Sequence, residues 1–434
     1  MASVLLCATP VHGHVTPVLA VATFLVDHGH RVRFLTGSRY QDKVEATGAE
    51  YLPLPAEADY DGSNLDAAFP GRVGLSGPAG IKFDLSTIFL KPAPAQLSAV
   101  DAAIAAETTD VVLVEGLFLG AAMLIARPRE TRPPVVVLGI VPLSLESVDT
   151  APYGLGVMPK PGVIGRVRDT LLAVLAKKVI FGSLQKEAER TVLAASGHPL
   201  RTFFLNYPAL ADGIVQFTVP SFEYPRSDLP DIVHFVGPVS RSTTSTQALP
   251  DWWGELDGSR PVVHVTQGTV ANMDYDELIA PAMAGLADEN VLVVVSTGGR
   301  DVATLPHPLP ANVRASEYLP YDKLLPLTDV LLTNGGYGGV HYAMEYGVPL
   351  VVAGLSEDKT EVTARVQWSG AGINLKTNHP KPPQVRDAVR RVLADPSYGK
   401  VSARIGADIV ASPGLAGLED VVMTLTGAGA VGSI

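Results

Sequence analysis

The sequence holds a single cysteine, Cys7, among 434 residues. One cysteine cannot form a disulfide within the chain, and it cannot supply a cluster of thiolates to zinc. Charged residues are also scarce, at 18%, and 33 Lys and Arg against 44 Asp and Glu give a formal net charge of −11. Binding to nucleic acid needs a dense basic face, which this balance does not offer. Disulfide scaffolds, cysteine zinc sites and nucleic-acid partners are therefore excluded.

Long apolar runs are missing too, although the mean hydropathy is +0.23. The most apolar stretch, residues 111–126, is interrupted by Glu115 and is shorter than the roughly 20 residues that span a bilayer. The opening residues, MASVLLCATP, have no basic segment and continue into a strand pattern, which is not typical of a signal peptide. We therefore expect a cytoplasmic protein without a membrane span, present as a monomer or a homodimer.

Short runs of Val, Leu and Ile alternate with amphipathic segments along the chain. Continuous apolar runs are typical of strands covered on both faces, as in parallel sheets with crossover helices. The predicted strands are residues 3–9, 32–35, 111–115, 135–140, 262–266, 291–296, 329–333 and 350–353. The predicted helices are residues 15–28, 275–289, 338–346, 359–369 and 383–394. This alternation predicts a doubly wound α/β architecture with parallel sheets.

The alternation occurs twice, and a Ser/Thr/Pro-rich stretch separates the two series. We predict a Rossmann-like domain at residues 1–238, a linker at 239–250 and a second Rossmann-like domain at 251–411. Two segments of the first half, residues 56–98 and 141–210, interrupt the pattern. Such insertions either shape a pocket or are plain surface excursions, and the sequence leaves both open.

The loop PVHGHVTP, residues 10–17, follows the first predicted strand. A helix is expected to begin near Val15, because Thr16 can cap it and Pro17 suits a first turn. His14 then lies at the carboxyl end of a strand and at a helix N-terminus, where open α/β sheets bind ligands. The helix dipole disfavours imidazolium, so we expect His14 to be neutral and able to act as a base. His12 is expected to be a solvated or hydrogen-bonded loop residue.

Glu115 ends another predicted strand within the apolar stretch VVLVEGLFLG. A carboxylate buried there is costly without a partner. Either backbone donors satisfy it, or it orients the imidazole of His14 and stabilises the charge that follows proton uptake. The chain has no G-x-S-x-G elbow, so such a base is expected to activate a substrate hydroxyl rather than a serine.

A glycine-rich turn, Asn334 to Gly339, joins the strand at 329–333 to the following helix. Glycines at this junction let a ligand approach the backbone, and the free amides at the helix N-terminus suit a diphosphate, although the turn can also be purely structural. The turn is neither a Walker A loop nor a G-x-G-x-x-G fingerprint. Two D-x-D triplets, at 59–61 and 274–276, suggest a metal, but helix capping explains the second more simply, so no metal site is expected.

Together these features resemble the GT-B glycosyltransferases of the bacterial macrolide and natural-product type (family 1), which are related to UDP-glycosyltransferases. The segment PVHGHVTPVLAVATFLVDHGHRVRFLT is similar to the family's GH-x-x-P loop with the helix and strand that follow. The segment LLTNGGYGGVHYAMEYGVPLVVAGLSEDKTEVTARVQWSGAG is similar to its donor-binding signature. The resemblance implies two Rossmann-like domains facing across a cleft. The first is expected to bind the acceptor and the second the nucleotide sugar, with a helix at residues 412–434 returning toward the first.

The resemblance also implies roles for single residues. His14 is expected to be the general base and Glu115 its acid partner. Tyr318 is expected to stack on the nucleobase, with the Leu319 backbone at the edge of the base. The remaining donor-site residues that the resemblance implies are Gly268, Thr269, Asn334, Gly335, Gly336, Gly338, Gly339, Tyr342, Glu357, Asp358 and Lys359. For the acceptor site we expect apolar residues of the two insertions, which alternatively serve only as core: Phe69, Phe83, Phe89, Tyr153 and Met158.

Three positions depart from the family pattern. Asn334 stands where a histidine usually contacts the diphosphate, and Asp358-Lys359, preceded by Glu357, replaces an Asp-Gln pair. Tyr342 replaces a glutamate that binds the ribose hydroxyls. A site without this carboxylate better tolerates a donor that lacks the 2′-hydroxyl. We therefore hypothesise a preference for dTDP-sugars over UDP-sugars.

The expected reaction is inverting transfer of a hexose, glucose or a deoxysugar, from a dTDP- or UDP-sugar to a hydroxyl of a hydrophobic natural product. Neither a cofactor nor a metal ion is expected. A sugar-nucleotide epimerase or hydrolase of the same fold remains open, and so does a non-catalytic auxiliary protein that binds a partner enzyme. The retained His14 and Glu115 weigh against the auxiliary role, whereas Asn334 and Tyr342 weigh for it.

Overall fold

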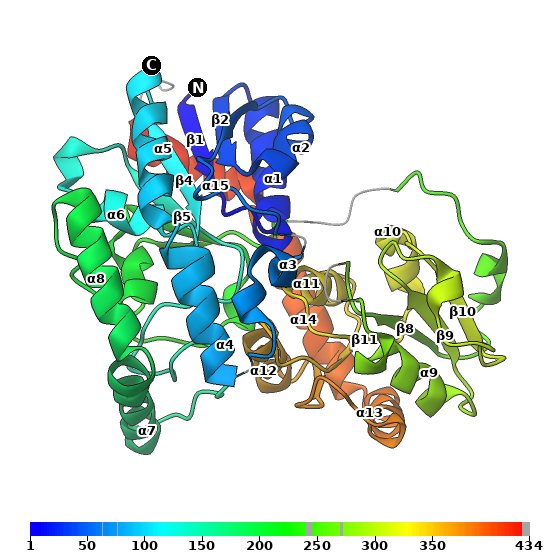
Figure 1. Cartoon of the computed structure of the whole chain (residues 1–434). Coiled ribbons are helices and arrows are strands. Elements are labelled where there is room, and N and C mark those ends of the chain that lie inside the picture. Colours follow the sequence, from blue (N-terminus) through cyan, green and yellow to red (C-terminus); the bar gives the residue numbers. More distant parts are fainter. Residues whose placement is uncertain (63, 76, 240–244, 270–271, 428–434) are drawn as a thin grey trace.

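Two parallel sheets form the framework of the molecule (Figure 1). The computed structural model describes residues 1–434 except 63, 76, 240–244, 270–271 and 428–434. In the first sheet the described strands follow the order β3-β2-β1-β4-β5-β6-β7, and in the second β10-β9-β8-β11-β12-β13. Their neighbouring strands pair in parallel, so the predicted doubly wound α/β fold is confirmed.

The strands of the first sheet lie between residues 3 and 235. They are β1 Ser3–Cys7, β2 Arg31–Thr36, β3 Glu50–Pro53, β4 Val111–Glu115, β5 Val135–Gly139, β6 Gly213–Gln216 and β7 Val233–Phe235. The strands of the second sheet are β8 Val262–Thr266, β9 Leu292–Ser296, β10 Val313–Ser316, β11 Val330–Thr333, β12 Leu350–Val352 and β13 Gly372–Asn374. The lone Cys7 is buried at the end of β1.

The described α-helices of the first half lie between residues 12 and 196. They are α1 His12–Asp27, α2 Gln41–Glu45, α3 Leu65–Ala68, α4 Gly77–Phe83, α5 Ala93–Ala106, α6 Gly120–Ala126, α7 Val163–Val174 and α8 Gly182–Ser196. Helices α5, α6 and α8 share one apolar cluster with the sheet. Helices α1 and α2 share a second apolar cluster with the sheet. The buried residues of α1 are three and four positions apart and form a single stripe.

The remaining helices are α9 Ile279–Leu286, α10 Tyr321–Leu324, α11 Tyr337–Glu345, α12 Lys359–Ser369, α13 Pro382–Ala394, α14 Ser397–Ala411 and α15 Leu415–Thr426. Helices α9 and α13 cover one face of the second sheet, and α11, α12 and α14 cover the other. Helix α15 leaves this unit and packs against α1, β4 and β6 of the first sheet. The predicted linker lies partly outside the described residues, and the domain boundaries stay predictions.

Two helix boundaries differ from those that the sequence predicted. Helix α1 begins at His12 rather than near Val15, because the carbonyl of Val11 accepts hydrogen bonds from the amides of His14 and Val15. Thr16 therefore does not cap it, and Pro17 lies inside it. The helix predicted at 275–289 is a 3₁₀ turn, Tyr275–Glu277, followed by α9.

The break between the 3₁₀ turn and α9 has a local cause. The amide of Ile279 donates to the side-chain oxygen of Gln267 at 3.0 Å, so α9 begins anew on a side-chain acceptor. The carboxylate of Asp274 accepts from the amide of Asp276 at 2.9 Å, which is the capping role expected for the second D-x-D triplet.

No single described helix is long and apolar enough to cross a bilayer. Helices α14 and α15, which are bent by 45° relative to each other, together have the length and composition of a membrane span.

Candidate active site

His14 and Glu115 meet at the point where the strand order of the first sheet reverses. The chain continues from β1 to β2 on one side, whereas β4 pairs with the other side of β1. Crevices at such reversal points, beyond the carboxyl ends of parallel strands, are where open α/β sheets bind ligands. Glu115 ends β4, His14 lies in the first turn of α1, and His14 Nδ1 is 2.7 Å from Glu115 Oε2.

Backbone donors also hold the Glu115 carboxylate, so it contacts both kinds of partner that the sequence offered, the backbone and His14. The amide of Thr9 donates to Oε1 at 3.1 Å, and the amide of Leu117 donates to Oε2 at 2.7 Å. The Glu115 side chain is 1% exposed. Burial raises its pKa, but the imidazole of His14 and these hydrogen bonds outweigh burial and hold the pKa below its ordinary value. The carboxylate is therefore ionised at neutral pH.

The same pairing changes the expectation for His14. Burial lowers the pKa of its imidazole, but the charge and hydrogen bond of Glu115, with Asp358 and Glu357 further away, raise the pKa above 6.5. The helix N-terminus therefore does not bring this pKa below its ordinary value, since a full charge in contact outweighs the half charge of a helix end. Because Nδ1 donates to the carboxylate, Nε2 is the atom free to accept a proton.

The loops of the second sheet converge at its own reversal point, between β8 and β11. Asn334 follows β11, and its Nδ2 donates to the carbonyl of Gln267, which follows β8, at 2.6 Å. Gly335 has φ +85°, and a Cβ there meets Thr363 Cγ2 at 2.6 Å, so only glycine fits. These contacts bring the loop that holds Gly268 and Thr269 beside the glycine-rich turn.

The N-terminus of α11 is open for a ligand. Gly336 is its N-cap residue, and Gly338 and Gly339 lie in its first turn. A Cβ built at Gly338 or Gly339 meets no atom within 4 Å. The first amides of a helix have no partner within the helix, and they carry its positive end. Such a helix start can bind an anion through backbone groups, and its role as a diphosphate site stays a prediction.

Tyr318 lies at the carboxyl end of β10 against the loop after β9. A Cβ at Gly299 meets Tyr318 Oη at 2.2 Å, so glycine is required for the ring to lie there. Half of the Tyr318 surface, 51%, is exposed. The neighbouring Leu319 is buried in an apolar cluster with Leu256 and Leu324. The stacking role of Tyr318 and the backbone role of Leu319 stay predictions.

The turn between β12 and α12 brings charge toward His14. Glu357 has φ +56°, a left-handed conformation that is rare for a residue with a side chain, and its carboxylate pairs with Lys359. Asp358 is the N-cap residue of α12 without making a side-chain cap, and burial raises the pKa of its carboxyl. Both carboxylates act on the pKa of His14. The turn between β12 and α12 therefore lies on the side of the second sheet that is near His14.

Within the described residues, no three His, Cys, Asp or Glu side chains come together as metal ligands do.

Similarity to known proteins shows the family to which the chain belongs. Residues 6–137 match the glycosyltransferase family 28 N-terminal domain, and residues 280–425 match the erythromycin biosynthesis protein CIII-like C-terminal domain. A 4′-demethylrebeccamycin synthase from Lentzea aerocolonigenes is 41% identical over 97% of this chain and 99% of that protein. A UDP-glycosyltransferase 2 from Phaeomoniella chlamydospora is 34% identical over 98% of this chain and 96% of its own. The chain is a natural-product glycosyltransferase.

Solved structures agree on the GT-B fold of this glycosyltransferase. The calicheamicin glycosyltransferase CalG4 superposes with a TM-score of 0.73 at 23% identity, covering 100% of both chains. The glycosyltransferase VinC, solved in complex with dTDP, superposes with a TM-score of 0.68 at 20% identity, covering 98% of this chain and 100% of that one. The predicted family and fold are therefore confirmed.

The structure places one of the predicted acceptor residues, Phe89, beside His14. The ring of Phe89 lies 5.9 Å from the imidazole of His14. Tyr153 precedes Gly154, whose amide donates to Glu361 of α12 at 2.8 Å, and burial raises the pKa of Tyr153 well above its ordinary value. Phe69 packs edge-on against Tyr60, at 5.0 Å between ring centroids. Phe83 is the ring nearest to Gly71, and Met158 supplies a backbone carbonyl to Arg168. Their acceptor role stays a prediction.

Tyr342, at the position of the family's ribose-binding glutamate, lies in α11 with its ring packed edge-on against Tyr321, at 5.8 Å between ring centroids. The side chain of Tyr342 therefore offers no carboxylate to a ribose diol.

Sequence reasoning missed residues that hold the catalytic pair. The hydroxyl of Thr9 donates to the carbonyl of Leu117, and the hydroxyl of Tyr207 donates to the carbonyl of Gly116 at 3.2 Å. Both fasten the turn that follows Glu115. Thr9 sits next to the motif and could have been noticed as a polar residue at a strand end. Tyr207 lies 91 positions from its partner, and nothing in the sequence pairs them.

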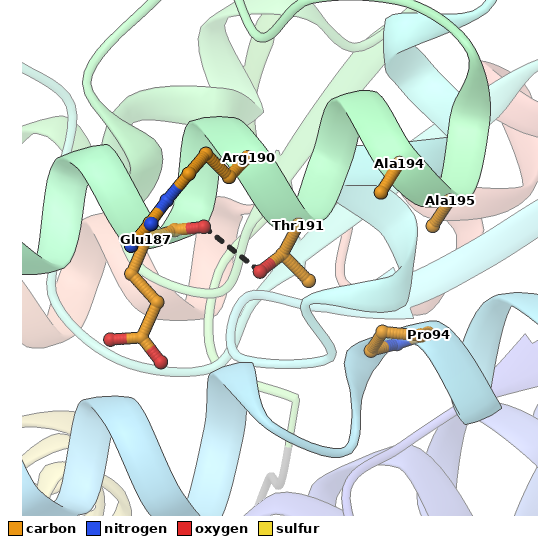
Figure 2. A pocket seen from close by; sticks show the side chains of 6 residues that line it. All are labelled: Pro94, Glu187, Arg190, Thr191, Ala194 and Ala195. Carbon is orange, nitrogen blue, oxygen red and sulfur yellow. Dashed lines mark hydrogen bonds between the residues drawn. The ribbon is translucent and has the colours of Figure 1, made fainter.

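Surface hollows lie elsewhere on the described molecule. One, of about 530 Å³, lies between Pro94 at the start of α5 and a face of α8 that presents Arg190, Thr191 and Ala194 (Figure 2). Another, of about 600 Å³, runs along β7 and α15. Neither is lined by a residue that the sequence assigned to the donor or acceptor site.

Proposed function

We propose that this glycosyltransferase moves a hexose, glucose or a deoxysugar, from a dTDP- or UDP-sugar to a hydroxyl of a hydrophobic natural product, with inversion at the anomeric carbon. The observation that carries the proposal is the contact of His14 Nδ1 with Glu115 Oε2 at 2.7 Å, at the reversal point of the first sheet. The relative named 4′-demethylrebeccamycin synthase supports an acceptor of the natural-product type.

In the proposed reaction, the acceptor hydroxyl donates its hydrogen to His14 Nε2. Its oxygen attacks the anomeric carbon while the bond from that carbon to the diphosphate oxygen breaks. His14 takes the proton, and Glu115 stabilises the imidazolium that forms. A single displacement of this kind inverts the configuration at the anomeric carbon.

The nucleoside diphosphate sugar is proposed to bind at the carboxyl ends of the second sheet. The amides at the N-terminus of α11, with Asn334 and Thr269, hold the diphosphate, and its charge needs no metal ion or cofactor there. Asp358, Lys359 and Glu357 face the sugar hydroxyls, and Tyr318 faces the nucleobase. The open first turn of α11 supports this assignment.

The acceptor is proposed to bind between the base and the insertions of the first half. Phe89 and Tyr153 form the part of its wall nearest to the reacting atoms, and Phe69, Phe83 and Met158 extend that wall. The ring of Phe89 beside His14 supports an apolar acceptor whose hydroxyl points to the imidazole.

Release of nucleoside diphosphate from a dTDP- or UDP-sugar, measured with and without a panel of phenols and macrolides, tests the proposal. We expect release only with an acceptor, together with a glycoside of inverted anomeric configuration. Release without any acceptor identifies a hydrolase, a retained configuration contradicts the displacement, and failure to bind a donor in calorimetry identifies an auxiliary protein.

We also propose that the protein works in the cytoplasm as a monomer or a homodimer. Cell fractionation and light scattering test these two statements, and recovery in a membrane fraction or a higher oligomer contradicts them.

A further inference from the structure

Helix α12 reaches across to the acceptor side through one carboxylate. Glu361 lies three residues after Asp358, on the second sheet's side, and its Oε1 accepts hydrogen bonds from the amides of Gly154 at 2.8 Å and Gly156 at 2.9 Å. These glycines lie more than 200 positions earlier in the chain, in the segment 153–158 that holds Tyr153 and Met158. We call this segment the 153–158 loop. One side chain therefore joins the proposed donor and acceptor sides.

The loop is shaped for this contact. Gly154 has φ +94° and Gly156 has φ +59°, and this left-handed backbone turns two amides toward one oxygen atom. A Cβ at Gly156 meets Thr360 Cγ2 at 2.7 Å and the Thr360 carbonyl at 3.0 Å. Glycine at this position therefore lets the loop lie directly on α12.

A buried ion cluster fixes the carboxylate that the loop binds. Glu361 Oε2 accepts from Arg365 Nη1 at 2.8 Å, and the other nitrogens of Arg365 donate to Glu223 Oε2 at 2.9 Å. Glu361, Arg365 and Glu223 are 4%, 1% and 2% exposed. The Tyr224 ring lies 4.2 Å from the Arg365 guanidinium. In Figure 1, α12 lies between the elements of the two sheets.

Such a cluster is poor as a source of stability, because the cost of removing charges from water offsets most of their attraction. Hydrogen bonds to an ionised acceptor are instead strong and directional. Both carboxylate oxygens of Glu361 accept such hydrogen bonds, Oε1 from the 153–158 loop and Oε2 from Arg365. Its geometry therefore defines where the 153–158 loop stands relative to the start of α12.

We propose that Glu361 is a positioning residue that fastens the 153–158 loop to helix α12, so that acceptor binding depends on this contact. The proposal rests on the proposed function, because it takes Tyr153 as an acceptor residue and Glu357 to Lys359 as donor residues.

Hydrogen exchange of the 153–158 loop tests the contact without any turnover. In Glu361→Ala the amides of Gly154 and Gly156 lose their acceptor, so the loop is expected to exchange faster by about tenfold or more, which corresponds to about 1.4 kcal/mol. Glu361→Gln keeps one acceptor oxygen, and its exchange is expected to lie between those of Ala and the wild type. Unchanged exchange in Glu361→Ala overturns the proposal.

Kinetics of a loop variant test the consequence without touching the ion cluster. Gly156→Ala forces the loop away from Thr360, so the acceptor KM is expected to rise by about tenfold or more while the donor Kd without acceptor stays unchanged. Gly162→Ala is the matched control: Gly162 also has a positive φ, +87°, but a Cβ there meets nothing within 4 Å. We expect an unchanged acceptor KM in this control.

The outcomes separate the two proposals. Faster exchange in Glu361→Ala with a raised acceptor KM in Gly156→Ala supports the positioning role. An unchanged KM in Gly156→Ala, or an equal rise in Gly162→Ala, overturns it. If the wild type transfers no sugar to any acceptor, the proposed function fails, whereas the exchange experiment still reports on Glu361.

Discussion

At the scale of single residues, the chemistry of His14 depends on one neighbour. A helix end carries about half a charge, spread over several amides, whereas the Glu115 carboxylate is a full charge at 2.7 Å. The pKa of the imidazole is therefore raised although the residue lies at a helix N-terminus. His14 holds a proton at acidic pH and becomes a competent base only when it loses that proton.

Transfer is expected to rise with pH, because imidazolium cannot accept the acceptor proton. The midpoint for the wild type lies above 6.5, the ordinary pKa of histidine. In Glu115→Gln the attraction that raises this pKa is gone, so the midpoint shifts to lower pH and the plateau rate falls by about 10²-fold or more. The pH dependence of kcat/KM measures both effects.

Glu107→Gln is the control for this experiment, because Glu107 is an exposed carboxylate that pairs with Arg31. Its profile should match the wild type. A midpoint that does not move in Glu115→Gln contradicts the pairing of Glu115 with the base.

The nucleobase preference is also a single-residue matter. Tyr342 offers no carboxylate to a ribose diol, so a dTDP-sugar is expected to outcompete the corresponding UDP-sugar. In Tyr342→Glu the preference should shift toward UDP, because the 2′,3′-diol gains an acceptor. A competition assay with both donors measures the ratio, and a clear preference of the wild type for UDP contradicts the hypothesis.

At the scale of the element, a negative charge at the N-terminus of α11 is expected to stabilise the helix and to weaken donor binding. In Gly339→Asp a carboxylate enters open space in the first turn, where it stabilises the helix by about 0.3–1 kcal/mol but repels a diphosphate. We expect an unchanged or higher Tm together with donor binding weakened by about tenfold or more. Calorimetry with dTDP and with UDP, beside thermal unfolding, measures both.

Gly339→Asn adds a side chain of the same shape without the charge and serves as the control. If Asn and Asp weaken donor binding equally, the effect is steric, and a diphosphate at this helix end is contradicted.

The elements that the sequence predicted are those with a purely apolar environment. The apolar runs predicted β1, β2, β4, β5, β8, β9, β11 and β12, which lie inside the two sheets. The edge strands β3, β7, β10 and β13 and the adjacent β6 gave no such run. An edge strand is short and covered less completely, so its residues need not be continuously apolar.

At the scale of the whole molecule, the buried cluster between the sheets holds two carboxylates with Arg365. In Arg365→Leu the buried Glu361 loses its cation and Glu223 keeps only Arg226, 3.8 Å away, so the free energy of unfolding is expected to fall by about 3–5 kcal/mol. Arg390→Leu removes an exposed arginine that pairs with Glu289, and it should cost at most about 1 kcal/mol. Urea unfolding measures both losses in the free energy of unfolding. Equal losses contradict the expectation that the buried carboxylates need Arg365.

Contacts at the ends of regular strands could be predicted from the sequence, whereas contacts of irregular loops could not. Glu115 ends β4 and His14 lies in the first turn of the helix that follows β1, and parallel topology brings such positions together, so their meeting could be predicted. The contact of Glu361 with Gly154 and Gly156 joins a helix to a loop without secondary structure. Its partners carry no periodic pattern, and only the folded chain shows which carboxylate meets which turn.

We propose that His14 takes the acceptor proton while residues of the second sheet hold the donor. Transfer by His14→Ala, measured beside its donor Kd, tests this claim most directly. We predict a loss of about 10²–10⁴ in kcat with donor affinity unchanged. Unchanged turnover, or a loss that is explained entirely by weaker donor binding, would contradict the account.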